Sequence, residues 1–203
     1  MGRELRNAKE ALRYPFWVAG NRRPPDNHYY KIARINRIRR RYQCDTLIET
    51  GTYFGQTVSA LKARFSKVLS VELSDGLYET NREIFRSEKT VRIFHGDSAD
   101  LLGEMIDASY GRIVFWLDGH YSDGITALGE SVTPILNELC VIKQKGRKGD
   151  CVLIDDIRLF VGRAGYPKID EVKAILYGIS ADVDINVDGD CLMALPRDVV
   201  YGA

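Results

Sequence analysis

The stretch Thr46-Leu-Ile-Glu-Thr-Gly-Thr-Tyr-Phe-Gly-Gln-Thr57 decides the fold of this 203-residue chain. It begins as an apolar strand that runs into Glu49, turns at Gly51 and Gly55, and opens a helix at Gln56. Glycine at position 51 permits a sharp turn, and glycine at position 55 permits a ligand to lie close to the start of the helix. The free N–H groups at a helix start suit a carboxylate or a phosphate.

Two acids beside this turn indicate which ligand it binds. Glu49 is placed to accept from a cationic amine, so an amino-acid moiety fits the turn better than a pyrophosphate does. Glu72 ends the next apolar strand, 21 residues after Gly51, where a carboxylate holds ribose hydroxyls. An amino acid joined to a ribose describes S-adenosylmethionine. The alternative is that the two glycines mark only a turn between a strand and a helix.

The composition is that of an ordinary globular protein, with 45% hydrophobic and 28% charged residues, and its length suffices for one full core. No apolar run approaches a membrane span, and the first residues lack the apolar core of a signal peptide. The widely spaced cysteines predict buried free thiols in a reducing compartment rather than disulfides or a zinc site. We therefore expect a cytoplasmic protein without a membrane span.

Positive charge is concentrated in residues 1–43, which contain 12 Lys and Arg against 3 Asp and Glu. We expect a helix over residues 1–20, broken by Pro15, then a proline-rich loop that includes His28. A second helix is expected over 31–42, with isoleucines recurring every three residues amid cations. This basic helix either packs on the domain with its arginines in solvent or forms a surface for an anionic partner. Aromatic residues do not alternate with the cations, which argues against nucleic acid.

Strands and helices alternate through the rest of the chain. Apolar runs predict strands at 46–51, 67–73, 91–97, 112–119 and 150–156, with helices at 56–65, 76–87, 98–108, 129–145 and 168–178. This alternation implies a parallel sheet covered by helices on both faces. Residues 181–187 and 191–195 then predict an antiparallel hairpin around Asp188-Gly-Asp190. A dinucleotide-binding fold would instead end in a sixth parallel strand, so the hairpin favours the S-adenosylmethionine interpretation.

Over residues 44–196 the chain resembles the class I S-adenosylmethionine-dependent methyltransferases. It is most similar to the catechol O-methyltransferase type and to the metal-dependent macrolide sugar O-methyltransferases. The resemblance implies a Rossmann-like, seven-stranded α/β sheet in a methyltransferase domain, residues 44–203, preceded by a basic helical extension, residues 1–43. It also implies the following cofactor-binding residues: Glu49, Gly51, Thr52, Tyr53, Gly55, Thr57, Glu72, Asp97, Ser98 and Asp118.

The same resemblance implies a metal site at two strand ends. Asp118 stands where the family has a metal-binding aspartate, and Asp155 and Asp156 stand where it has further oxygen ligands. Converging carboxylates repel one another unless a cation joins them, which favours Mg²⁺ or a similar divalent cation. The alternative is that one or two of these acids cap helices or bind the cofactor's amine. The chain has Tyr121 in place of the lysine base of the catechol enzymes, and His120 where the sugar enzymes usually have a second aspartate.

The expected function is methyl transfer to a small hydroxylated acceptor, such as a sugar or a phenol. A divalent cation would lower the pKa of the acceptor hydroxyl and orient it. The expected catalytic residues are Asp118, His120 and Tyr121, and His120 is either a base or a metal ligand. Two alternatives stay open: a metal-free methyltransferase with His120 as base, and a non-catalytic cofactor-binding protein. A small-molecule acceptor is the expected partner, nucleic acid is not expected, and a homodimer is left open.

Overall fold

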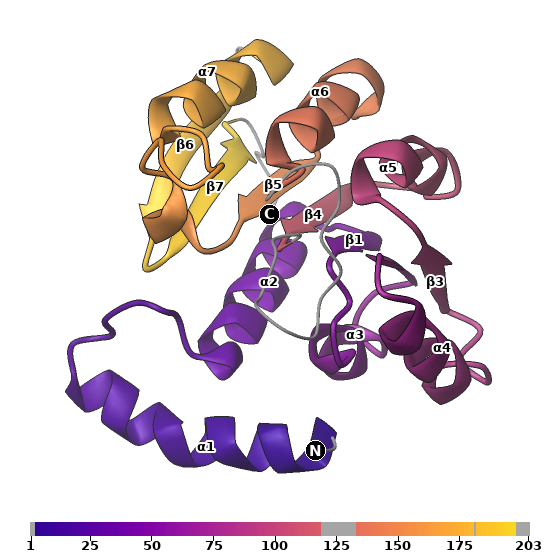
Figure 1. Cartoon of the computed structure of the whole chain (residues 1–203). Coiled ribbons are helices and arrows are strands. Elements are labelled where there is room, and N and C mark those ends of the chain that lie inside the picture. Colours follow the sequence, from indigo (N-terminus) through magenta and orange to yellow (C-terminus); the bar gives the residue numbers. More distant parts are fainter. Residues whose placement is uncertain (1–2, 119–132, 181, 198–203) are drawn as a thin grey trace, which may run out of the picture.

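The computed structural model describes residues 3–118, 133–180 and 182–197, which build one seven-stranded sheet with helices on both faces (Figure 1). The strand order is β3-β2-β1-β4-β5-β7-β6. Strands β1 to β5 run parallel, whereas β7 pairs antiparallel with both β5 and β6. The predicted parallel sheet with its terminal antiparallel hairpin is therefore confirmed.

The strands are β1 (Thr46–Thr50), β2 (Lys67–Glu72), β3 (Val91–His95), β4 (Ile113–Leu117), β5 (Cys151–Ile154), β6 (Val183–Asp188) and β7 (Cys191–Pro196). The α-helices are α1 (Arg3–Ala19), α2 (His28–Tyr42), α3 (Gln56–Leu61), α4 (Asp75–Ile84), α5 (Ser98–Asp107), α6 (Ile135–Lys145) and α7 (Ile169–Ile179). A short 3₁₀ helix, η1 (Ile157–Leu159), follows β5.

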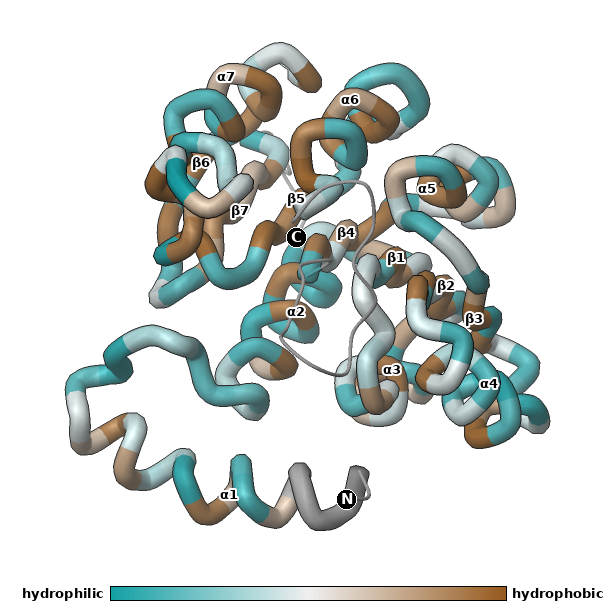
Figure 2. Tube along the Cα trace, in the orientation of Figure 1, coloured by the Kyte–Doolittle hydropathy of each residue, from teal (hydrophilic) through white to brown (hydrophobic). Residues whose placement is uncertain are grey.

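Two apolar cores lie on opposite faces of the sheet, because the central strands are buried on both sides. On one face, residues such as Leu102 of α5, Leu139 of α6 and Leu176 of α7 cover the sheet. On the other face, Ile35 and Ile38 of α2 pack with residues of α3 and β4. Figure 2 shows the apolar strands at the centre and polar residues along the outer helices. No helix in the described ranges is long and apolar enough to cross a membrane.

Helices α1, α2 and α6 differ from their predicted course. Helix α1 continues through Pro15, although we expected a break there. Helix α2 begins at His28, because the Asn27 side chain caps it by accepting from the backbone N–H of Tyr29. His28 therefore belongs to the first turn of α2 and not to the preceding loop. Helix α6 begins at Ile135, directly after Pro134, six residues later than predicted.

Helix α2 is fixed to the turn of the β6–β7 hairpin by a buried ionic network. The guanidinium of Arg34, only 1% exposed, contacts the carboxylates of Asp26 and Asp188. The hydroxyl of Tyr30 donates to Asp188 Oδ1 at 2.5 Å. The backbone N–H of Asp190 donates to Asp26. The interpretation of α2 as a helix packed on the domain is thus correct in its packing, but Arg34 is buried rather than solvated.

Candidate active site

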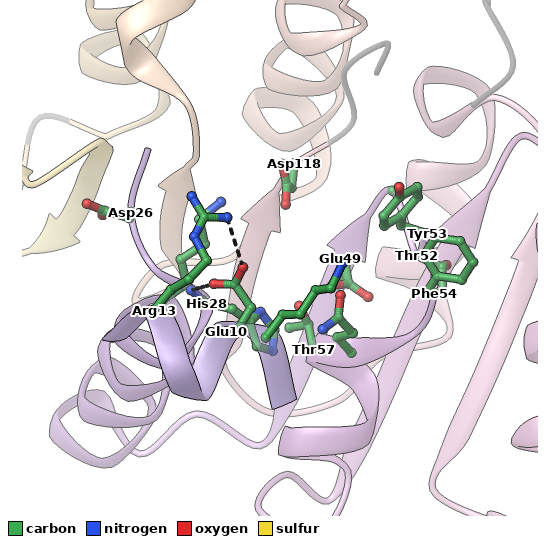
Figure 3. A pocket seen from close by; sticks show the side chains of 14 residues that line it. Glu10, Arg13, Asp26, His28, Glu49, Thr52, Tyr53, Phe54, Thr57 and Asp118 are labelled. Carbon is green, nitrogen blue, oxygen red and sulfur yellow. Dashed lines mark hydrogen bonds and ion pairs between the residues drawn. The ribbon is translucent and has the colours of Figure 1, made fainter. Parts of the chain in front are cut away.

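The candidate site lies where the sheet reverses its winding, at the carboxyl ends of β1 and β4. These strands are neighbours in the sheet, yet the chain leaves β1 toward β2 on one side and β4 toward β5 on the other. Ligands of open α/β sheets bind at such a point. A pocket of about 400 Å³ opens there (Figure 3). It is lined by Lys9, Glu10, Arg13, Asp26, His28, Lys31, Glu49, Gly51, Thr52, Tyr53, Phe54, Gln56, Thr57 and Asp118.

The glycine turn after β1 forms one wall of this pocket. Gly51 has a φ of 86° and Gly55 a φ of 68°, which glycine adopts without strain. A Cβ atom on Gly55 would lie 2.4 Å from Asn81 Oδ1 and 2.7 Å from Phe85 Cε2. Glycine at position 55 thus lets the turn pack against α4 and Phe85, a reason that the sequence did not reveal. Of the two glycines, only Gly51 lines the pocket.

Glu49 lies buried at the end of β1 and lines the pocket. Its Oε2 accepts a hydrogen bond from the Ser70 hydroxyl at 2.7 Å, and Figure 3 shows Thr57 beside it. Burial raises the pKa of Glu49 to about 8, although hydrogen bonds from Ser70 and Thr57 oppose the rise. A cationic group in the pocket would favour the ionised carboxylate. The position of Glu49 is therefore compatible with its predicted contact to an amine, which stays a prediction.

Glu72 connects the turn after β1 with the start of α4. Its carboxylate accepts from the backbone N–H of Tyr53 at 2.7 Å and from that of Ser74 at 3.0 Å. It is buried, and burial raises its pKa while these backbone donors oppose the rise. Glu72 does not line the pocket. Its predicted contact with a ribose stays a prediction, and the structure adds a bracing role for the turn.

Asp97 and Ser98 follow β3 and also make contacts within the protein. The Asp97 side chain caps α5 by accepting from the backbone N–H of Ala99 at 2.8 Å. The Ser98 hydroxyl donates to Glu138 Oε1 at 2.5 Å. Glu138 is fully buried on α6, and burial raises its pKa to about 7. The predicted contact of Asp97 and Ser98 with the cofactor stays a prediction.

The three predicted acids meet at the ends of β4 and β5. The backbone N–H of Asp118 donates to Thr50 O, and that of Asp155 donates to Leu117 O, so the sheet itself aligns them. One carboxylate oxygen from each of Asp118, Asp155 and Asp156 lies within 4.8 Å of the others. We call these three residues the acid cluster. The predicted convergence of the three carboxylates is confirmed, although a bound metal is not thereby shown.

Two cationic side chains contact the acid cluster. The Lys31 ammonium of α2 donates to Asp155 Oδ2 and lies 3.8 Å from Asp156 Oδ1. The Arg158 guanidinium of η1 donates to Asp156 Oδ1 at 2.5 Å. Burial lowers the pKa of Lys31, but the three carboxylates outweigh burial and raise it above its ordinary value. Lys31 was missed in the sequence because Asp155 lies 124 residues further along the chain.

The next candidates are the residues that could accept a proton at this site. His120 and Tyr121, two of the predicted catalytic residues, lie outside the described residues. His28 lines the pocket, where Figure 3 shows it next to Glu10. Burial and then Lys31 lower the pKa of His28, against the opposing effect of Glu10 and Asp118. His28 is a weak candidate from the sequence alone, because the prolines before it indicate a loop.

Helix α1 also contributes to the pocket. Glu10 accepts from the Asn27 side-chain amide at 3.1 Å and from the backbone N–H of His28 at 3.3 Å. Lys9 and Arg13 line the same side of the pocket. The sequence signalled a helix here, but gave no sign that it would reach the end of β1.

Comparison with known proteins identifies the fold. No protein-family model matches the chain. A ribosomal RNA small subunit methyltransferase A of Pelotomaculum thermopropionicum is 34% identical over 73 residues, which are 34% of this chain and 25% of that protein. The chain thus spans about a quarter of the length of this curated relative.

Solved structures match over most of the chain. The O-methyltransferase TomG from Streptomyces achromogenes, in complex with SAM, has a TM-score of 0.60 and 15% identity, covering 83% of this chain and 80% of its own. The O-methyltransferase from Bacillus cereus, in complex with SAH, has a TM-score of 0.61 and 12% identity, with coverages of 93% and 90%. The SAH-bound methyltransferase PaMTH1 of Podospora anserina has a TM-score of 0.59 and 14% identity, with coverages of 98% and 97%.

Identities this low establish the fold rather than the reaction. The matches extend over 83% to 98% of this chain, which folds as one seven-stranded sheet with a terminal antiparallel hairpin. The chain therefore has the fold of the class I S-adenosylmethionine-dependent methyltransferases, of the O-methyltransferase type.

Proposed function

We propose that this protein transfers a methyl group from S-adenosylmethionine to a hydroxyl oxygen of a small acceptor, such as a sugar or a phenol. The observation that carries the proposal is one pocket that reaches from Glu49 and the glycine turn to Asp118. A cofactor held at Glu49 and an acceptor held at the acid cluster would therefore face the same space.

Methyl transfer from a sulfonium is an in-line displacement, and the cofactor supplies the reactive methyl group. The protein has to align the acceptor and remove its proton. We assign Glu49 to the cofactor's ammonium group and the acid cluster to the acceptor hydroxyl. His120, which the sequence leaves open as a base or a metal ligand, is the base in the metal-free alternative. His28 is the histidine of the described ranges that lines the pocket, and its lowered pKa keeps the imidazole able to accept a proton.

The sequence predicts a divalent cation at the acid cluster. The acid cluster has the right chemistry, since hard cations prefer carboxylate oxygens. However, Lys31 contacts Asp155, and both Lys31 and Arg158 lie near Asp156. With these side chains in place the acid cluster does not fit a resident divalent cation. The arrangement favours the metal-free alternative.

The test is transfer of a labelled methyl group from S-adenosylmethionine to a panel of sugars and phenols. Each reaction is run with Mg²⁺ and with excess chelator, and Asp118→Asn serves as the variant that removes one charge from the acid cluster. The proposal is supported if the wild-type protein transfers the methyl group and Asp118→Asn abolishes this transfer while it retains the affinity for the cofactor. Binding of S-adenosylhomocysteine without transfer to any acceptor would support the cofactor-binding protein instead.

The chelator arm separates the two enzyme mechanisms. Loss of turnover in chelator, restored by Mg²⁺, would establish a divalent cation, whereas full activity in chelator would establish the metal-free mechanism. Calorimetry provides the check on the cofactor: binding of NAD without binding of S-adenosylhomocysteine would contradict the whole assignment. The cytoplasmic location stays a prediction, and a homodimer stays open.

A further inference from the structure

Lys31 reaches the acid cluster from α2, whereas the three acids follow strands β4 and β5. Its side chain is 17% exposed, and that of Asp155 is fully buried. The ammonium contacts Asp155 Oδ2 and lies near Asp156, and it also lines the pocket beside Asp118. A lysine thus lies among three carboxylates at the point where a divalent cation is expected.

The backbone that carries Lys31 is firmly held. Tyr30 and Arg34, on either side of it in α2, both contact Asp188 of the β6–β7 hairpin. Ile35, one turn further along the helix, is fully buried in the core. The α2 backbone at Lys31 is therefore fixed relative to β5. An exposed lysine that meets an acid by chance would lack both this anchoring and the burial of its partner.

We propose that the Lys31 ammonium takes the place of a divalent cation at the acid cluster, so that Lys31 and such a cation exclude each other there. A cation bound by Asp155 and Asp156 would need the oxygens that Lys31 contacts, and two cations at such short separation repel strongly. The positive charge of Lys31 also offsets the repulsion among the converging carboxylates. That repulsion is the electrostatic reason to expect a metal there.

This inference rests on the proposed function for the meaning of the acid cluster, but its test involves no turnover. Failure of the inference and failure of the methyltransferase assignment are therefore distinguishable. The quantities measured are the thermal unfolding temperature, in chelator and with millimolar Mg²⁺ or Mn²⁺, and the affinity for Mn²⁺ by calorimetry. The variants are Lys31→Met, Asp155→Asn and the double variant that combines them.

The wild-type unfolding temperature should be the same in chelator and in divalent cation. Removing one partner of a buried ion pair leaves an uncompensated charge, so Lys31→Met should unfold about 6–20 °C lower in chelator. Mn²⁺ should restore much of this loss and bind Lys31→Met at least about tenfold more tightly than wild type. Asp155→Asn in the Lys31→Met background should restore stability and abolish the Mn²⁺ response.

Lys62→Met is the matched control, because Lys62 pairs with Glu88 away from the acid cluster and both side chains are about one-third exposed. It should lose little stability and gain no Mn²⁺ affinity. Equal Mn²⁺ affinity in wild type and Lys31→Met would overturn the proposal, as would an unchanged unfolding temperature for Lys31→Met in chelator. If Lys31→Met does not fold under any condition, the double variant decides: a folded, cation-insensitive double variant supports the proposal, and an unfolded one overturns it.

Discussion

The buried carboxyl of Glu49 should couple cofactor binding to pH. Its pKa of about 8 means that it is largely protonated at pH 6.5, whereas an ammonium group binds the ionised form. Wild-type affinity for S-adenosylhomocysteine should therefore rise from pH 6.5 to pH 8.5, with proton release on binding. Glu49→Gln should weaken binding roughly ten- to a hundredfold at pH 8.5, and less at pH 6.5.

Calorimetry in buffers of different ionisation enthalpy measures both the affinity and the released proton. Glu104→Gln, at a largely exposed acid on α5, is the control and should behave as wild type. An affinity ratio between wild type and Glu49→Gln that stays constant across this pH range would place the cofactor's amine elsewhere.

Glu72 allows a cofactor contact to be separated from bracing of the turn. Glu72→Ala deprives the backbone N–H groups of Tyr53 and Ser74 of their acceptor and should weaken S-adenosylhomocysteine binding roughly ten- to a hundredfold. Glu72→Gln retains one acceptor oxygen and nearly the same shape. If Glu72 binds the ribose, Glu72→Gln should lose affinity about as strongly as Glu72→Ala, while its unfolding temperature falls less.

Calorimetry and thermal unfolding of both variants supply the comparison. An unchanged dissociation constant for Glu72→Gln, with a lower unfolding temperature for Glu72→Ala, would reduce Glu72 to a structural role.

Helix α2 depends on its buried ionic network for its position on the sheet. Arg34→Met keeps the length of the side chain but leaves Asp26, itself 5% exposed, without its charged partner. Such a loss costs about 3–5 kcal/mol in free energy of unfolding, and denaturant unfolding should measure it. Asp26→Asn in the Arg34→Met background should recover part of the loss, because it removes the unpaired charge.

Arg197→Met is the matched control, since the Arg197–Asp184 pair is more than half exposed on the same hairpin. It should leave stability unchanged. Equal effects of Arg34→Met and Arg197→Met would mean that the network contributes nothing beyond a surface ion pair.

Across the molecule, buried acids should make stability fall as pH rises. The folded-state pKa values of Glu49, about 8, and Glu138, about 7, lie above their ordinary value of 4.5. Between pH 4.5 and these folded-state pKa values, the folded state binds more protons than the unfolded state. Their contribution is therefore fully present below about pH 4.5 and is lost as pH rises through 7–8. At about 1.4 kcal/mol per pKa unit, we expect the free energy of unfolding to drop by roughly 4 kcal/mol between pH 6 and pH 9.

Denaturant unfolding of the ligand-free protein at several pH values provides the measurement. Glu49→Gln combined with Glu138→Gln should flatten the profile. A profile that rises from pH 6 to pH 9, or a decline that the double variant retains in full, would contradict this origin.

The sheet could be predicted from the sequence because the residue patterns that specify its strands are local. Near-continuous apolar runs specify buried parallel strands, and the strict alternation before Asp188 specifies the hairpin. The acids at the ends of β4 and β5 could be placed together because parallel strands end at one edge of a sheet. The position of α2 could not be predicted in this way. Its isoleucine stripe shows that one side is buried, but Lys31 and Arg34 find partners 124 and 154 residues away, and no local pattern encodes such pairs.

The contacts between α2 and the β6–β7 hairpin also have a consequence for the order of folding. Tyr30 bonds to Asp188 across 158 positions, and Asp190 bonds to Asp26 across 164. On the ribosome, α2 is synthesised long before its hairpin partners emerge, and closing such long loops is entropically slow. Arg34 can pair with the nearby Asp26 early, but its contacts with Asp188 must wait until nearly the whole sheet exists. Docking of α2, and with it the arrival of Lys31 at the acid cluster, is then among the last steps of folding, and pulse-labelling of its amide protons would time it.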